Sequence, residues 1–285
     1  MENKINSIYH LTAALTWYIK ALIQYAPDRL RFDCIDALED FLLNEKLVKN
    51  RTELKEFILK AQKDLQWLYE HEVNILTVFD SKYPERFLFL KNPPFILTYF
   101  GEIDFSHQCF SIVGSRNPSG ASSQWLDTEV SKLLSIKKLC VVSGGARGVD
   151  QKAHALALRH QRPTYMLLPS GLARPYPKNI MAWKSAIVEL NGAIISQFSP
   201  FEDMRKHYFH MRNQIIASFS PSILIVDAKR RSGTMMTANY ASSLGTEVLV
   251  VPNSPIFEAS LGGLDLLFAG ADLVRDHEDI LELIN

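Results

Sequence analysis

The pattern of apolar positions along the chain changes near residue 72. Before that point, apolar residues recur at the spacing of amphipathic helices, and Pro27 follows the first helical stretch. Helices are expected over residues 11–25, 34–47 and 54–69. The pattern therefore predicts a small all-helical domain over residues 1–72.

After residue 72, short apolar runs alternate with helical stretches. Strands are expected over residues 73–79, 93–100, 109–113, 139–142, 163–168, 193–198, 222–226 and 247–251. Strands that are apolar throughout are typical of a parallel sheet with helices on both faces. The sequence therefore predicts an α/β protein, in which an extended Rossmann-like parallel sheet over residues 73–285 follows the helical domain.

Two consecutive strands of this sheet run into loops that each contain glycine, serine and arginine. At the carboxyl edge of an α/β sheet, such loops bring backbone N–H groups and a helix start close to a phosphate. Neither loop matches the dinucleotide fingerprint G-x-G-x-x-G or the nucleoside-triphosphate loop G-x-x-x-x-G-K-[ST]. The glycines would also suit tight turns alone, but two such loops in succession favour a phosphate site. The candidate residues are Gly114, Ser115, Arg116, Ser143, Gly144, Gly145 and Arg147.

A basic and aromatic segment, residues 205–216, is expected at the same edge of the sheet. Lys206 is expected in the loop before a helix, and the aromatic residues Tyr208 and Phe209 follow it. Cations that hold phosphates beside rings that stack on bases are what single-strand binding requires. Packing of both rings into the core is the alternative. The candidate residues of this segment and of the later loop at 227–234 are Lys206, Phe209, Arg212, Asn213, Gly233 and Thr234.

Composition and charge narrow the classes of protein. The 285 residues include 31 Lys and Arg and 31 Asp and Glu, so polyanion binding would depend on local patches rather than on net charge. The cysteines Cys34, Cys109 and Cys140 lack metal-ligand spacing, and neither H-E-x-x-H nor C-x-x-C occurs. No signal peptide is recognisable, and no apolar run approaches the ~18 residues of a membrane span. A cytoplasmic protein without metal, cofactor or catalytic residues is expected.

Taken together, these motifs resemble those of the DNA-processing protein A family, also called DprA or Smf. The stretches that carry the resemblance are Ser111-Ile-Val-Gly-Ser-Arg116, Val142-Ser-Gly-Gly-Ala-Arg-Gly-Val-Asp150, Arg212-Asn-Gln-Ile-Ile-Ala217, Ser232-Gly-Thr234 and Tyr176-Pro177. The resemblance implies an extended Rossmann fold that binds single-stranded DNA without sequence preference and without turnover. It also implies a homodimer that loads the RecA recombinase onto DNA in natural transformation. By position, it assigns DNA contacts to residues 114–116, to residues 143–145 with Arg147, and to Lys206, Phe209 and Arg212.

Some positions depart from the family pattern, and two other classes of protein stay open. Gln214 stands in place of an arginine, Asn253 in place of a glycine and Asp227 in place of a glutamate. One alternative is a phosphoribohydrolase-like enzyme, which needs a P-G-G-x-G-T-x-x-E segment; the stretch at 232–237 supplies no glutamate. The other is a nucleotide-sensing Rossmann module, which would use the same loops for a mononucleotide.

Overall fold

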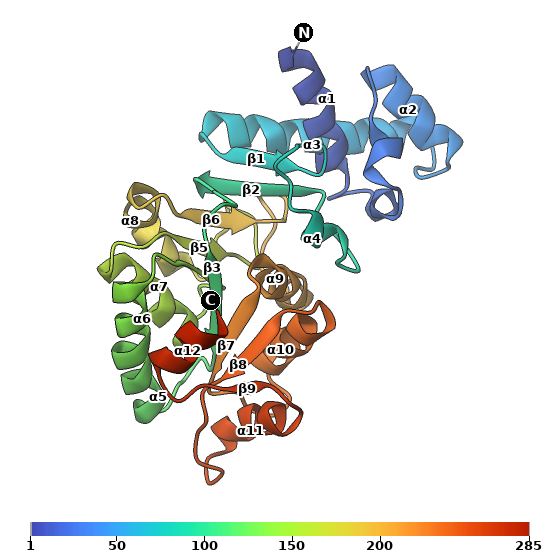
Figure 1. Cartoon of the computed structure of the whole chain (residues 1–285). Coiled ribbons are helices and arrows are strands. Elements are labelled where there is room, and N and C mark those ends of the chain that lie inside the picture. The colour runs from blue at the N-terminus through green and yellow to red at the C-terminus, as the bar shows by residue number, and fades with distance from the viewer. Residues whose placement is uncertain (1, 285) are drawn as a thin grey trace.

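One mixed sheet runs through most of the chain, and helices cover both of its faces (Figure 1). The computed structural model describes residues 2–284, with side chains from Ile8 onward. Within that range the strand order of the nine-stranded sheet is β1-β2-β6-β5-β4-β3-β7-β8-β9. The strands are β1 Asn74–Thr77, β2 Ile96–Gly101, β3 Cys109–Gly114, β4 Cys140–Ser143, β5 Thr164–Leu167, β6 Ala193–Ser196, β7 Ser222–Val226, β8 Glu247–Val250 and β9 Asp272–Leu273.

The helices alternate with the strands after β3 and precede them at the amino terminus. They are α1 Glu2–Leu15, α2 Ile35–Asn44, α3 Arg51–Glu70, α4 Glu85–Leu88, α5 Gly120–Trp125, α6 Ser131–Ile136, α7 Val149–Arg159, α8 Lys184–Glu189, α9 Lys206–Phe219, α10 Gly233–Ser243, α11 Leu261–Phe268 and α12 His277–Leu283. Short 3₁₀ segments cover Lys20–Gln24, Pro27–Leu30, Lys178–Trp183 and Glu258–Ser260, and a π-helical segment, Leu126–Val130, joins α5 to α6. Among the described helices, none is long and apolar enough to cross a bilayer.

The predicted α/β fold class is confirmed, with corrections in detail. Strands β3 to β9 pair in parallel, but β1 and β2 are antiparallel, and β2 also runs antiparallel to β6. The helix expected over residues 11–25 is divided, because α1 ends at Leu15 and only a 3₁₀ turn follows. Lys206 is not in a loop, since α9 begins there and Arg205 is its amino-terminal cap.

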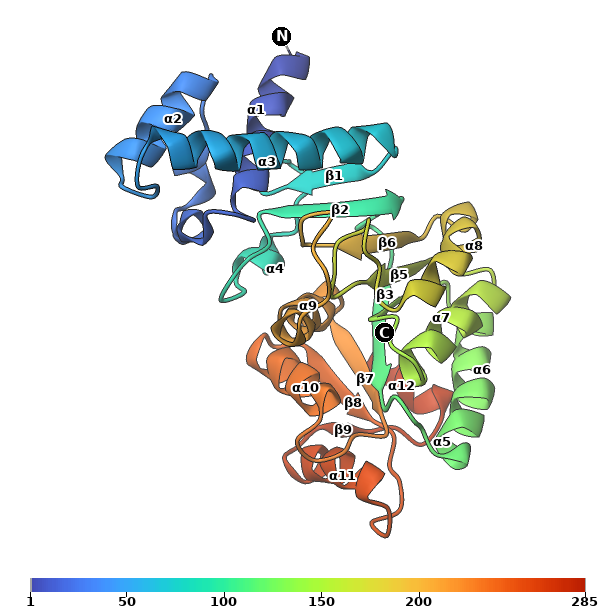
Figure 2. The ribbon, with the colours of Figure 1, turned by 180° about the vertical axis from the view of Figure 1, so that it is seen from behind.

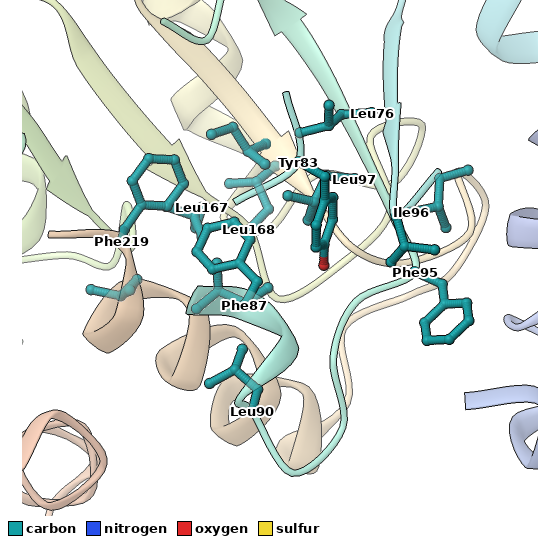
Figure 3. Packing of buried hydrophobic residues seen from close by; sticks show 14 of the residues in the cluster. Leu76, Tyr83, Phe87, Leu90, Phe95, Ile96, Leu97, Leu167, Leu168 and Phe219 are labelled. Carbon is teal, nitrogen blue, oxygen red and sulfur yellow. The ribbon is translucent and has the colours of Figure 1, made fainter. Parts of the chain in front are cut away.

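Alternate residues of the central strands pack into separate cores on the two faces of the sheet. Phe110 and Ile112 of β3 lie in a core with α6, α7 and α12. Cys109 and Val113 of the same strand pack on the other face, with α9 and α10. Figure 2 shows these two groups of helices on opposite sides of the sheet. This second core continues past Phe219 and Phe87 to β2, as Figure 3 shows.

The amino-terminal helices lie beyond β1, and polar contacts tie them to the loop that follows β6. The carboxylate of Asp64 on α3 accepts hydrogen bonds from the Tyr18 hydroxyl (2.5 Å) and the Ser199 hydroxyl (2.7 Å). The Trp17 indole N–H donates to the Gln197 carbonyl oxygen at 3.0 Å. Burial raises the pKa of Asp64, although both hydroxyls stabilise the charged form. The loop that leads into α9 is therefore anchored by the helices that precede the sheet.

The topology places a crevice at one point of the carboxyl edge. Strand β3 has β4 on one side and β7 on the other. From β3 the sheet extends through β4, β5 and β6 in one direction and through β7, β8 and β9 in the other. In an open α/β sheet, ligands bind where the strand order reverses in this way. The ends of β3, β4 and β7 are therefore where a binding site is expected.

Candidate functional site

Two adjoining cavities lie at this point of the carboxyl edge. The larger, about 570 Å³, lies between the loop after β3 and the start of α10. The smaller, about 280 Å³, lies over the glycine loop after β4 and extends to Tyr176. Arg116, Ala146, Phe209 and Arg212 line both cavities. We refer to the two cavities together as the carboxyl-edge site.

The ring of Phe209 is the aromatic centre of this site. The guanidinium carbons of Arg116 and Arg212 lie 5.1 Å and 5.8 Å from its centroid, and Tyr176 contacts it edge-on at 6.0 Å. Tyr208 faces elsewhere: its ring stacks on Phe198 at 4.1 Å, and its hydroxyl donates to Glu202. Of the two aromatic candidates, only Phe209 is therefore offered to a ligand in this site.

A buried ion pair supports the arginine behind this ring. Arg212 is 4% exposed, and its Nη1 lies 3.8 Å from Oδ2 of the buried Asp150 at the start of α7. Burial lowers the pKa of Arg212 to about 10, against the opposing effect of Asp150. Burial raises the pKa of Asp150, while Arg212 favours the carboxylate form. The Nε of Arg212 has no hydrogen-bond partner among the described residues.

The glycine loop is built around Asp150. The N–H groups of Gly144 and Ala146 both donate to its carboxylate, the second at 3.3 Å. A Cβ on Gly144 would lie 1.3 Å from Nη1 of Arg212, so glycine is required for the arginine to occupy this place. The N–H of Ser115 donates to the Val226 carbonyl oxygen at 3.1 Å. Three of the N–H groups in these loops, those of Ser115, Gly144 and Ala146, are thus bonded within the protein and do not face a phosphate.

The opposite wall of the larger cavity is formed by α10 and the loop after β7. Thr234 Oγ1 donates to the Gly114 carbonyl oxygen at 3.0 Å, and Asn213 Nδ2 donates to the Gly233 carbonyl oxygen at 3.4 Å. Asp227 has a positive φ of 52°, a conformation in which Asp and Asn are enriched. These contacts hold the start of α10 against the middle of α9 and the end of β3.

Two of the departures from the family pattern contact one another at this wall. The Asn253 side-chain amide donates to Oδ1 of Asp227 at 2.7 Å, and the Ser119 N–H donates to Oδ2 at 2.8 Å. The Asp227 carboxylate is therefore fully engaged. Gln214, the third departure, lines neither cavity.

Most of the predicted site residues come together here, and three do not. Ser143 is fully buried and donates to the Ile112 carbonyl oxygen at 2.6 Å, Gly145 packs near Met166, and Lys206 is exposed outside both cavities. The predicted residues that line the site are Gly114, Ser115, Arg116, Gly144, Arg147, Phe209, Arg212, Asn213, Gly233 and Thr234. Sequence reasoning missed the lining residues Asn117, Gln151, Asn179 and Ala259. Of these, only Asn117 could have been predicted from the sequence, because it directly follows the first loop.

The chain is similar to proteins of one family. The family model described as DNA recombination-mediator protein A matches residues 74–285. Protein Smf of Synechocystis sp. is 31% identical over 246 residues, which cover 83% of this chain but 59% of that protein's length. Among solved structures, DNA processing protein A of Streptococcus pneumoniae has a TM-score of 0.77 at 25% identity and covers 96% of both chains. That of Helicobacter pylori has a TM-score of 0.65 at 28% identity and covers 75% of this chain and 95% of that one. Since the family model matches well over half of it, the chain belongs to the DNA recombination-mediator protein A family.

Proposed function

We propose that the carboxyl-edge site binds single-stranded DNA without sequence preference. The observation that carries this proposal is the Phe209 ring, which has the guanidinium carbons of Arg116 and Arg212 at 5.1 Å and 5.8 Å from its centroid and shares a cavity with the exposed Arg147. A ring within a group of cations suits a strand whose bases are free to stack. The solved structure of the Helicobacter pylori relative was described for its single-stranded DNA binding mode, which supports the same ligand class here.

The two kinds of side chain would act on different parts of the strand. The exposed Arg116 and Arg147 would pair with phosphates, and so would the exposed Lys206, which lies outside the two cavities at the start of α9. Phe209 would take a base on its face. Arg212 would act mainly by supporting the Phe209 ring, since it is buried against Asp150.

We also propose that the site binds DNA without turnover. Its two buried carboxylates have internal partners, since Asp150 pairs with Arg212 and Asp227 accepts from Ser119 and Asn253. A carboxylate held in this way is poorly placed to act as a general base. Release of free base from AMP, or nicking of DNA at an enzyme-like rate, by the purified protein would contradict this proposal.

The double variant Arg116→Ala with Arg147→Ala tests the DNA site. With three exposed cations on phosphates, the log–log salt slope for oligodeoxythymidine should be roughly −2, from about −0.7 per contact on a single strand. The double variant should bind more weakly at low salt and lose about 1.4 units of that slope. Fluorescence anisotropy at several salt concentrations measures both quantities. Arg159→Ala, an exposed arginine at the other end of α7, is the matched control. A folded double variant with unchanged affinity and slope would place the site elsewhere.

We propose that the protein acts in the cytoplasm as a homodimer. Its interface would include α11 and the loop before it, near the carboxyl terminus of the chain. Phe268 at the end of α11 and Ile256 in the loop before it are 97% and 87% exposed, whereas Ile280 of α12 is buried in the core. An exposed apolar surface of this kind suits isologous pairing. Light scattering should give twice the mass of one chain, and Phe268→Asp should give the mass of one. The mass of a single chain for the unmodified protein would argue against the dimer.

The family resemblance suggests the RecA recombinase as a partner, and we propose that this protein delivers single-stranded DNA to it in natural transformation. On an oligonucleotide covered by a single-strand-binding protein, RecA filaments should assemble faster when this protein is present than when it is absent. Equal rates with and without this protein would contradict the proposal.

A further inference from the structure

A third cavity, about 300 Å³, lies at the opposite edge of the sheet. Cys109 at the start of β3 and Pro221 before β7 line it, whereas the carboxyl-edge site lies at the other ends of these strands. It shares no lining residue with either cavity of that site. Any ligand of this cavity would therefore be separate from the DNA proposed above.

Aromatic rings form one wall of this amino-edge cavity. Phe219, the last residue of α9, lies 5.5 Å from the Phe87 ring and 6.0 Å from the Phe105 ring, with Phe105 nearly parallel to it at 24°. Figure 3 shows Phe87 and Phe219 beside one another. Phe105 is 36% exposed, so its ring can be reached from solvent. A flat apolar group would find stacking partners here.

The other wall carries a cation that lacks a carboxylate partner. Arg86 of α4 is half-buried, and burial lowers its pKa. Its one hydrogen bond is long, 3.4 Å from Nη2 to the Thr246 hydroxyl. No Asp or Glu of residues 8–284 forms an ion pair with it. A guanidinium removed from water in this way is stabilised by an anion.

The number of available charges limits the kind of anion. His107, the second basic residue of the cavity, is held by the Tyr165 hydroxyl at 3.1 Å from its Nδ1, and its Nε2 lies 3.8 Å from Asp104. A nearby carboxylate thus balances His107 if it is protonated, and Arg86 alone supplies unbalanced charge. One planar guanidinium matches one carboxylate, through two parallel hydrogen bonds.

We propose that the amino-edge cavity binds an aromatic monocarboxylate, whose carboxylate pairs with Arg86 and whose ring lies against Phe105 and Phe219. This chemistry occurs in free aromatic acids and in the carboxyl terminus of a protein chain that ends in an aromatic residue. Both sources offer an aromatic ring and one carboxylate, so either could use the ring wall and Arg86. The site does not depend on the proposed DNA binding.

Calorimetric titration with 3-phenylpropionate, and with a short acetylated peptide that ends in phenylalanine, tests this proposal. At least one of the two should bind with a Kd below about 1 mM. The matching amides, 3-phenylpropanamide and the peptide amide, should bind roughly tenfold more weakly, because they lack the charge that pairs with Arg86. Binding of the free acid alone identifies a small-molecule source, and binding of the peptide alone identifies a protein terminus.

The Cys109 thiol provides a second readout. Cys109 lines the cavity and is 7% exposed, whereas Cys140 is fully buried. The exposed Cys34 can be replaced by serine, a suitable cap for α2. In Cys34→Ser protein, the ligand should slow the alkylation of Cys109 by iodoacetamide. Arg86→Gln should weaken binding roughly tenfold and remove this protection, and Phe105→Ala should also weaken binding. Lys91→Gln, an exposed cation outside the cavity, is the control.

Two results would overturn the proposal. One is that neither carboxylate probe binds or protects Cys109 in the folded protein. The other is that Arg86→Gln, with an unfolding temperature equal to that of the parent protein, binds the probes as tightly as the parent.

Discussion

Replacement of Arg212 by methionine is expected to destabilise the protein by about 3–5 kcal/mol, because Asp150 then stays buried without its ion-pair partner. Methionine keeps much of the volume of the arginine side chain, so the loss is that of the charge rather than of packing. Urea unfolding at neutral pH measures the change. Arg116→Met, at an exposed arginine of the same site, is the matched control and should change stability little.

The loss of stability should depend on pH in a predictable direction. The pKa of Asp150 is already raised by burial, and the loss of Arg212 removes a group that lowers it. A carboxyl whose folded pKa lies above its unfolded value of about 3.9 binds more protons in the folded state. The variant therefore loses stability as pH rises from the unfolded pKa through the folded one. The loss of stability relative to the parent protein should therefore be smaller at about pH 5 than at about pH 7.

A companion variant separates this explanation from general damage to the site. In the double variant Asp150→Asn with Arg212→Met, no charge is left buried, so stability should recover in part relative to Arg212→Met alone. Its deficit should also no longer change between these two pH values. An equal deficit for Arg212→Met at both pH values would show that the ion pair does not account for the effect.

Gly114→Ala should destabilise the protein by about 3 kcal/mol, whereas Gly233→Ala should leave it unchanged or slightly more stable. A Cβ at Gly114 would lie 2.0 Å from the Val226 carbonyl oxygen and 2.6 Å from a methyl group of Val149, so β3, β7 and α7 would have to separate. At Gly233 the nearest atom to such a Cβ is 4.0 Å away, and alanine favours the helix that begins there.

Denaturant midpoints of the two glycine variants give the comparison directly. Both glycines line the larger cavity. If each were glycine only to admit a ligand, the two variants would show similar DNA affinity and similar stability. The expected contrast assigns Gly114 to close packing of backbone and leaves Gly233 replaceable. Equal stabilities would contradict the packing role.

The strands were predictable because their apolar runs are continuous, as in residues 222–226 between two helices. Strand direction was not, because an apolar run is the same in either direction; the antiparallel β1 and β2 follow from the pairing alone. Tyr208 and Phe209 were equivalent in the sequence, yet neighbours on a helix point about 100° apart, so only one can face the site.

The ion pair of Asp150 with Arg212 was the largest omission in the site. The two residues are far apart in the chain, and no local pattern shows that an acid at the start of one helix meets an arginine of another. The glycine loop was correctly placed at the edge of the sheet, but the acceptor of its N–H groups is an internal carboxylate. A loop in which two N–H groups are bonded to an internal carboxylate has the same sequence as one in which they are open to a phosphate.

The contact of Asp64 with Ser199 limits how this protein can diversify. The family model begins at residue 74, and we propose that residues 1–72 form a separate helical domain. Two of its side chains, Trp17 and Asp64, nevertheless form hydrogen bonds with residues 197–199, in the loop that leads into α9 and its Phe209. A chimera that took its first 72 residues from a relative would keep the bonds to Ser199 and the Gln197 carbonyl only if that relative supplied an equivalent carboxylate and indole. Exchange of amino-terminal domains within the family is therefore expected to succeed only when the loop after β6 is inherited together with the helices that hold it.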